Sequence, residues 1–195
     1  AQEKIVADVQ QALERKFRGP QKPAVSYVVT ALAHPDALVA MDAVGLAAPG
    51  EDGAAGKPPR RVLLPRLQGG ANSAVLPAGR VIYVSGQAEK GDLAEATRKT
   101  MESLRATLTF LGRTNDDIVQ VKAFLRPASE IAVAEKEIVT FFGKASAPPL
   151  VFVEWKDAAP IEIELIAYGG SAKDAPKEAI EFFPPPNMKA SPVFS

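Results

Sequence analysis

The hydrophobic pattern of residues 80–167 switches repeatedly between the period of a β-strand and that of an α-helix, and this switching constrains the fold more than any other feature. Residues 80–86 are rich in β-branched and aromatic side chains and follow Gly79, which predicts a strand entered from a turn. Asp92 followed by Glu95 has the form of a capping box, and Gly112 stands after the last residue of an apolar helical stripe. These signals predict a helix between them.

Downstream of this helix the same alternation continues. Ser129 can cap a second helix, whose apolar residues lie on one face and which Gly143 ends. Three further strands are predicted, at Val119–Leu125, Leu150–Glu154 and Ile161–Ala167. The last two are close enough along the chain to pair. With one further strand before residue 80, the order β-β-α-β-α-β-β predicts an α+β domain of ferredoxin-like topology with one sheet and two helices on one face.

The other face of this sheet has no helix to cover it. Glu162 and Glu164 both point to that face, because side chains alternate along a strand. Two neighbouring carboxylates can share a proton and suit acid/base chemistry, whereas charges at a solvated or paired interface need no such role. We favour the second interpretation for both glutamates. This face must therefore be either covered by a partner or exposed to solvent.

The composition excludes several kinds of site. The 195 residues contain no Cys and one His, which excludes thiolate metal sites and argues against a multi-His metal centre or a Ser–His–Asp triad. We therefore predict no metal and no cofactor. Lys and Arg together number 23, as do Asp and Glu, so the chain lacks the basic bias of a nucleic-acid binder. No apolar run approaches the ~20 residues of a membrane span.

Pro/Gly-rich joints divide the chain. We predict a complete domain at 61–170, a linker at 48–60, a partial repeat of that domain (a helix and two strands) at 1–47, and a tail at 171–195 that resembles the start of another repeat. The repeat rests on equal spacings: Phe17 precedes Pro23 as Phe142 precedes Pro148. The matched segments are 4–17 with 129–142, 23–28 with 148–153, 39–44 with 161–166 and, more loosely, 179–195 with 62–76. A chance likeness of short apolar strands is the alternative.

Several landmarks of the complete domain resemble one family. They are Gly79–Gln87 (GRVIYVSGQ), Asp117–Val121, Phe124-Leu125, Phe141-Phe142, Pro148 and Ile161–Ala167. In this order they resemble the RidA (YjgF-like) reactive imine and enamine deaminases, also known as L-PSP endoribonuclease-like proteins. The resemblance implies a chorismate-mutase-like α+β fold assembled as a trimer, in which the open sheet faces pack together. It also implies clefts between subunits, where an arginine clamps a small 2-imino or 2-oxo acid and a glutamate positions the water that hydrolyses C=N.

The family's functional positions transfer to this sequence one by one. Ser85 matches the cleft serine, and Glu164 matches the glutamate, which the resemblance implies is catalytic. The substrate-binding arginine falls at Leu150, the cleft tyrosine near Asn72 and the cleft asparagine at Glu135. Leucine cannot form the bidentate pair that holds a carboxylate, and Glu135 would repel one. Acidic imines are therefore poor candidate substrates.

Three functions follow from the resemblance. The first is hydrolysis of imines or enamines that are uncharged or cationic. The second is a binding or structural protein that keeps the trimeric or pseudo-trimeric assembly and its small-molecule clefts without the deaminase reaction. The third, endoribonuclease activity, ranks last because the chain has neither a phosphate clamp nor an obvious base. A cytoplasmic location is favoured, although the Ala1-Gln2 start is compatible with signal-peptide cleavage and export.

Overall fold

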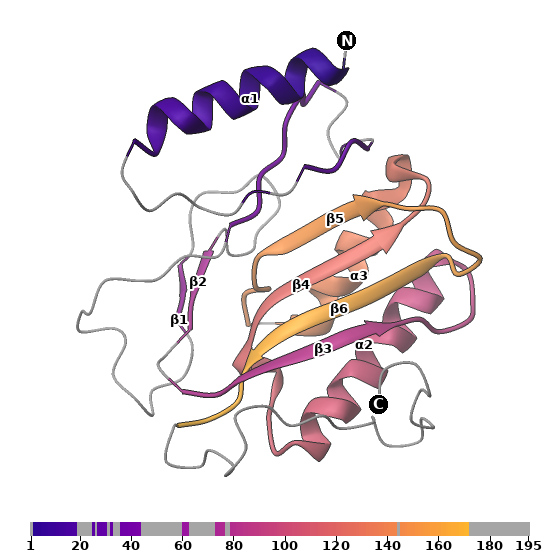
Figure 1. The fold of residues 1–195 in the computed structure, drawn as a ribbon. Helices are drawn as coiled ribbons and strands as arrows, with labels where there is room; N and C mark the ends of the chain where they lie inside the picture. The colour runs from indigo at the N-terminus through magenta and orange to yellow at the C-terminus, as the bar shows by residue number, and fades with distance from the viewer. Residues whose placement is uncertain are drawn as a thin grey trace, which may run out of the picture.

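The structure is a computed structural model that describes residues 2–18, 25, 27–30, 32, 36–43, 60–62, 73–76, 79–143 and 145–171. Figure 1 shows its elements. The helices are α1 (Gln2–Lys16), α2 (Leu93–Phe110) and α3 (Ile131–Phe142), with short 3-10 turns η2 (Asn115–Asp117) and η3 (Ala128–Glu130). The strands are β1 (Arg60–Val62), β2 (Ser73–Val75), β3 (Val81–Gln87), β4 (Ile118–Leu125), β5 (Leu150–Glu154) and β6 (Ile161–Tyr168). From β3 onward this order confirms the predicted alternation.

A four-stranded sheet in the described chain has the strand order β3-β6-β4-β5. β6 runs antiparallel to both of its neighbours, and β4 runs parallel to β5. The prediction that residues 150–154 pair with 161–167 is therefore wrong. The helix α3 connects β4 to β5 as a crossover, which makes these two strands parallel neighbours and leaves the other side of β4 for β6. Between β5 and β6 the chain passes the end of β4, where the backbone N–H of Trp155 donates to the carbonyl of Leu125 at 3.2 Å.

The strands β1 and β2 form a separate two-stranded antiparallel sheet, with Arg61 opposite Ala74. The sequence predicts one sheet, so this small ribbon is an addition to the expected plan. The four-stranded sheet and the two helices behind it nevertheless form the α+β architecture that was predicted, with α2 and α3 on the same face (Figure 1).

Local capping explains the ends of α2. Asp92 Oδ1 accepts a hydrogen bond from the backbone N–H of Glu95 at 2.8 Å, as the capping pattern predicts. Gly112 has a φ of 69°, a left-handed conformation that glycine adopts without strain. Between these ends the helix buries one stripe against the sheet. The buried residues are Leu93, Ala96, Thr97, Thr100, Met101, Leu104, Thr107 and Leu108.

The helix α3 ends as predicted but begins differently. Gly143 has a φ of 59° directly after its last turn. At the other end Glu130, not Ser129, is the N-cap residue and its side chain makes no capping hydrogen bond. The reason is the 3-10 turn η3, whose N-cap is Pro127 and in which the Glu130 N–H donates to the Pro127 carbonyl at 3.0 Å. The prediction of a Ser129 cap is wrong for that reason.

The two faces of the sheet differ as the alternation predicts. In β6 the residues Ile161, Ile163 and Leu165 are buried toward α2 and α3 and belong to the hydrophobic core. Glu162 and Glu164 point to the other face and are half-buried. Tyr83 of β3 lies on this open face with 76% of its surface exposed. No described helix covers it.

The N-terminal region contains the predicted helix α1. Of the segments 23–28 and 39–44, where strands were expected, the described residues 25, 27, 28 and 39–43 belong to no sheet. Two hydrogen bonds tie this region to the domain: the hydroxyl of Thr30 donates to the carbonyl of Glu154 at 3.1 Å, and Gln120 Nε2 donates to Asp42 Oδ1 at 2.8 Å. Of the segments 48–60 and 171–195 only Arg60 and Ser171 lie within the described residues, so the division into domains remains a prediction.

Candidate functional site

The candidate site begins at an irregularity in β3. Val84 pairs with Leu165 and Gln87 pairs with Ile163, so Ser85 and Gly86 together lie opposite the single residue Glu164. This is the arrangement of a β-bulge, which redirects side chains and is common beside functional sites. Ser85 is exposed on the open face, as alternation from Tyr83 places it, and the extra residue lets Gln87 face inward.

The side chain of Gln87 holds the end of β3 against the helix layer. The side chain is buried on the helix side of the sheet, where its Nε2 donates to the hydroxyl of Thr107 in α2 at 3.2 Å. This contact fixes the end of β3 to α2. In the Ser-Gly-Gln sequence the serine therefore faces the open side of the sheet, and the glutamine is buried on the helix side.

Gly86 lies directly beneath the side chain of Glu162. A Cβ atom at Gly86 would overlap Glu162 Oε1 and Cδ and would lie 2.6 Å from Glu162 Cγ. The carboxyl group of Glu162 thus occupies space that any other residue type at position 86 would fill. The glycine allows the acid to lie against the backbone of β3.

The environment raises the pKa of Glu162. Burial is the largest cause, because it disfavours the charged form, and the neighbouring carboxylates of Asp157 and Glu164 add to the effect. A carboxyl group of this kind keeps its proton to a higher pH than an ordinary glutamate. It can therefore act as an acid at a pH where its neighbour is a carboxylate.

Glu164 has a cationic partner. Its Oε1 lies 3.1 Å from Nζ of Lys122, which is directly opposite it in β4. The next pair on the same face is Phe124 opposite Glu162, and the ring of Phe124 lies 5.5 Å from that of Trp155. We call Ser85, Gly86, Glu162, Glu164 and Lys122 the open-face cluster.

The structure brings together only part of the predicted site. Ser85 and Glu164 are neighbours on the open face. Leu150, at 9% exposure, belongs to the core on the helix side of the sheet, and Glu135 is half-buried in α3. Within one chain, Leu150 and Glu135 therefore lie on the helix side of the sheet, apart from Ser85 and Glu164 on the open face. Asn72 lies outside the described residues.

The sequence reasoning missed Lys122, Gly86 and the contact between Gly86 and Glu162. The position of Lys122 could have been predicted from the sequence, since the alternation of β4 places it on the same face as the two glutamates. The Gly86 contact had none, because it depends on the bulge. The inward direction of Leu150 also means that an arginine placed there would bury a charge in the core rather than extend the cluster.

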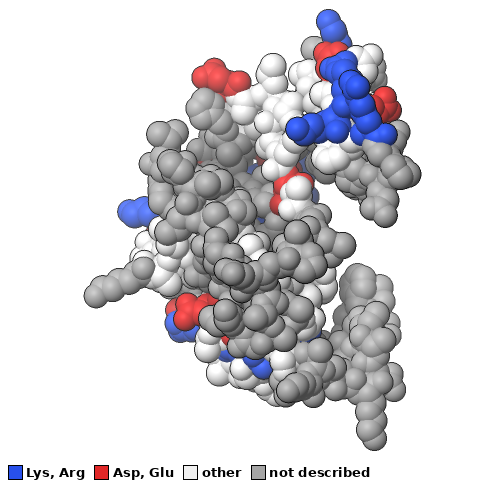
Figure 2. Space-filling model, turned by 90° about the vertical axis from the view of Figure 1, so that its left-hand side faces the viewer, with Lys and Arg blue, Asp and Glu red and all other residues white. Residues whose placement is uncertain are grey.

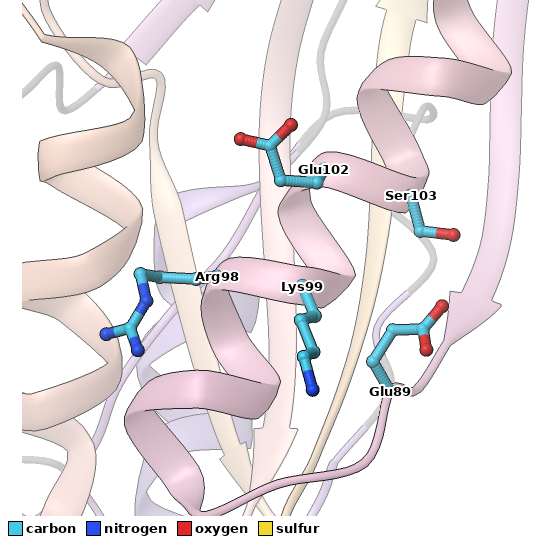
Figure 3. A pocket seen from close by; sticks show the side chains of 5 residues that line it. All are labelled: Glu89, Arg98, Lys99, Glu102 and Ser103. Carbon is cyan, nitrogen blue, oxygen red and sulfur yellow. The ribbon is translucent and has the colours of Figure 1, made fainter.

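A second surface feature lies on α2. A shallow hollow of roughly 610 Å³, open to solvent, is lined by Glu89, Arg98, Lys99, Glu102 and Ser103 (Figure 3). Three of its four charged residues are already engaged: Arg98 with Glu137 at 3.2 Å, Lys99 with Glu95 at 2.8 Å, and Glu102 with Arg105. The side chain of Arg98 extends toward α3 (Figure 3). This hollow is not part of the open-face cluster.

Residues 67–169, just over half of the chain, match the family model described as Endoribonuclease L-PSP. The chain belongs to this family. This confirms the resemblance inferred from the landmarks of the sequence.

Curated relatives of this L-PSP family member include two RutC family proteins. The protein PH0854 of Pyrococcus horikoshii is 31% identical over 112 residues, which is 51% of this chain and 87% of the relative. The protein PYRAB12510 of Pyrococcus abyssi is 32% identical over the same length and the same shares.

Solved structures similar to the L-PSP domain include members of the YjgF group. Rv2704 of Mycobacterium tuberculosis, a member of the YjgF/YER057c/UK114 family, is 25% identical with a TM-score of 0.43 and covers 50% of this chain and 85% of its own. The YjgF gene product of E. coli is 23% identical with a TM-score of 0.43 and covers 53% of this chain and 90% of its own.

No helix in the described part of the chain has the length and apolar character to cross a bilayer. Nor does this part of the chain contain a cluster of three or more His, Cys, Asp and Glu side chains arranged to hold a metal ion.

Proposed function

We propose that this L-PSP family protein hydrolyses imines or enamines that carry no carboxylate group, and that the open-face cluster does so in clefts formed when copies of the chain pack their open sheet faces together. The observation that carries the proposal is the pair of carboxyl groups beside Ser85. One of them, Glu162, has a raised pKa, and the other, Glu164, is paired with Lys122.

The two carboxyl groups suit the two proton transfers of the reaction. Hydrolysis of an imine adds water to carbon and then breaks the C–N bond, which yields a carbonyl compound and an amine or ammonia. Glu164 is the catalytic carboxylate that takes a proton from the attacking water, in line with the glutamate of the family. Glu162 in its protonated form gives a proton to the departing nitrogen. Lys122 offsets part of the negative charge, so both acids can remain close together.

The charge of the cluster determines the substrate class. The family's carboxylate-binding arginine is replaced by Leu150, which lies in the core. The cation of Lys122 is engaged by Glu164. An acidic imine would find no free cation in the cluster, whereas a protonated iminium group would be attracted by its carboxylates.

The open face supplies the argument for self-association. It carries Tyr83 and Val81 exposed in β3 and lies opposite the helix layer. An exposed tyrosine and valine on a face that no described helix covers are suited to an interface with a second copy of the chain. The family resemblance adds a trimer as the expected assembly.

The test compares two substrates and two variants. One imine is generated by an amine oxidase from an amine that carries no carboxylate, and the other by an amino-acid oxidase from an amino acid. Hydrolysis of each imine is followed by the formation of its carbonyl product. We expect turnover of the first only, and a loss of about 10²–10⁴-fold for Glu164→Gln. Glu102→Gln, outside the cluster, is the matched control. Turnover of neither substrate would overturn the proposal.

A gain-of-function variant tests the substrate class separately. Val151 is half-buried in β5 directly opposite Lys122, so it lies on the open face where Leu150 does not. Val151→Arg is expected to permit hydrolysis of the acidic imine. No change in the preference would show that the cluster does not determine it.

A second function is favoured by one observation. The ion pair with Lys122 engages Glu164, which suits a small-molecule-binding protein without turnover. Binding of an uncharged imine analogue that Glu164→Gln leaves unchanged, with no hydrolysis, would support it. Cleavage of RNA by wild-type protein, lost in Glu164→Gln, would instead support the third function.

A further inference from the structure

The open face carries two aromatic rings beside Glu162. Phe124 in β4 lies directly opposite Glu162 in β6 and, on its other side, opposite Val153 in β5. The centroids of the Phe124 and Trp155 rings are 5.5 Å apart, and the ring planes are tilted by 45°. All three apolar side chains are half-buried, so part of each is accessible. We call Phe124, Val153 and Trp155 the aromatic shelf.

The aromatic shelf is separate from the hydrophobic core. The described core lies on the helix side of the sheet, where Phe152 of β5 packs against it, and it includes none of the three shelf residues. The indole Nε1 of Trp155 is shielded from solvent and has no hydrogen-bond partner in the described chain. Buried tryptophans usually bond this group, so no polar contact of the indole holds the ring in place. Core packing therefore does not account for the two rings.

Glu162 has different neighbours on its two sides across the sheet. On one side its carboxyl group lies over Gly86, which has no side chain. On the other side is Phe124. Along β6, the next residue on the same face is Glu164, which is paired with Lys122. The aromatic shelf is therefore the apolar surface that adjoins Glu162.

The charges around Glu162 favour a positively charged ligand. The carboxylates of Asp157 and Glu164 lie near enough to raise the pKa of Glu162. Lys122 is the cation of the open-face cluster, and Glu164 engages it. Figure 2 shows the largest group of Lys and Arg side chains at the top of the molecule, over α1. The carboxyl groups beside the aromatic shelf thus outnumber the lysine, which leaves an excess of negative charge there.

A small molecule with both a cation and an aromatic ring fits this arrangement. Directly opposite residues on one face of an antiparallel pair have Cβ atoms about 4.5–5.5 Å apart, a span that a link of one or two carbon atoms can bridge. A ring that lies against Phe124 and Trp155 gains contact area and favourable aromatic geometry. The cationic nitrogen is attracted by the carboxylates and by the faces of the same rings.

We infer that the aromatic shelf binds the side group of the substrate, and that the imines hydrolysed at the open-face cluster are arylalkyl imines. The cationic nitrogen lies at the carboxyl groups, and the aryl ring packs on Phe124 and Trp155. This inference rests on the proposed function, because it concerns the substrate of the same cluster. The two aromatic residues determine specificity and transfer no proton.

Binding tests the aromatic shelf without requiring turnover. The 2-phenylethylammonium and n-butylammonium ions carry the same charge, and only the first has a ring. Each is titrated into the full chain by isothermal calorimetry. We expect the dissociation constant of the ring compound to be lower by about fivefold or more, since aromatic contacts add to the effect of burying the ring. Equal affinities, or no measurable binding of 2-phenylethylammonium, would overturn the inference.

The fluorescence of Trp155 locates the bound ring, because Trp155 is the single tryptophan of the chain. Saturation with 2-phenylethylammonium should slow the quenching of this tryptophan by acrylamide, and saturation with n-butylammonium should slow it less. Quenching that 2-phenylethylammonium leaves unchanged would place the ring elsewhere and contradict the inference.

Variants of the aromatic residues make the result specific. Trp155→Leu keeps an apolar side chain but removes the ring, and should reduce the preference to within about twofold. Trp155→Phe keeps a ring and removes only the unbonded indole donor, so it should retain most of the preference. Phe110→Leu, at an exposed aromatic residue of α2, is the matched control and should leave the preference unchanged. A preference that survives both Trp155→Leu and Phe124→Leu would overturn the inference.

Hydrolysis separates this inference from the proposed function. The imines of 2-phenylethylamine and n-butylamine are generated by an amine oxidase, and kcat/KM for each is divided by its uncatalysed rate constant. We expect the aryl imine to be preferred by about fivefold or more, and Glu164→Gln to lower turnover of both while keeping the binding preference. Hydrolysis of both imines without preference would overturn the inference and leave the proposed function standing. Ring-selective binding with hydrolysis of neither would overturn the proposed function and support the aromatic shelf as a ligand site.

Discussion

The contact between Gly86 and Glu162 gives the sharpest test of the site's geometry. In the wild type, Gly86→Ala introduces a Cβ atom that would overlap the Glu162 carboxyl and lie 2.6 Å from its Cγ. The glutamate must therefore leave its position. In a Glu162→Ala background the same substitution meets no such atoms.

The magnitude follows from two opposing effects. Overpacking costs about 1–3 kcal/mol, and the lower half of that range applies because Glu162 is half-buried and can rotate toward solvent. Replacing Gly by Ala at a compatible backbone position stabilises by about 0.4–1 kcal/mol, and Gly86 is not among the glycines with a left-handed φ. We expect a net loss of about 0.5–1 kcal/mol in the wild type and a net gain of about 0.5 kcal/mol in the Glu162→Ala background. The coupling free energy is thus about 1–1.5 kcal/mol, within the usual range for residues in contact.

The assay is urea unfolding of the four proteins of the cycle. Trp155, the single tryptophan, reports it through fluorescence, since its ring lies 5.5 Å from that of Phe124 in the sheet. An additive double variant would refute the reasoning. It would mean that the Glu162 side chain does not lie over Gly86.

Three further predictions follow. Leu104→Ala should lower the free energy of unfolding by about 2–5 kcal/mol, because Leu104 is fully buried, whereas Phe110→Ala on the exposed side should change it little by the same urea measurement. Glu162→Gln should be more stable than the wild type near neutral pH and lose that advantage below pH 4.5. The raised pKa of Glu162 means that the stability contributed by its protonated form is lost as the pH rises and the group ionises. Equal thermal unfolding curves of the two proteins at both pH values would contradict this. Tyr83→Asp should shift light scattering toward the monomer, and an unchanged mass would show that the open face is not the interface.

The helices and strands could be predicted from the sequence because their signals are local. The Asp92 cap and the glycines at 112 and 143 marked ends that the structure reproduces within a residue or two. The order of strands could not be predicted in the same way. The pairing of β5 with β6 failed because neighbours in a sheet depend on the crossover through α3, and no pattern inside a strand records that.

The candidate site shows the same division. Alternation along β6 was enough to place Glu164 on the open face. It did not reveal the overlap of Glu162 with Gly86, which arises from two residues of β3 facing one of β6. Leu150 was matched to a cleft position by alignment alone, and its side chain proves to face the core. Alignment gives the residue, but the direction of a side chain depends on the pleat.

The middle position of β6 has a consequence for how the domain matures. The strand that joins β3 to β4 is the last of the four in the chain. A nascent chain halted before Ile161 would hold β3 and the β4–β5 pair as separate sheet fragments, each with an unpaired strand edge of the kind that promotes aggregation. Synthesis of the eight residues of β6, and not the formation of either helix, therefore closes the sheet.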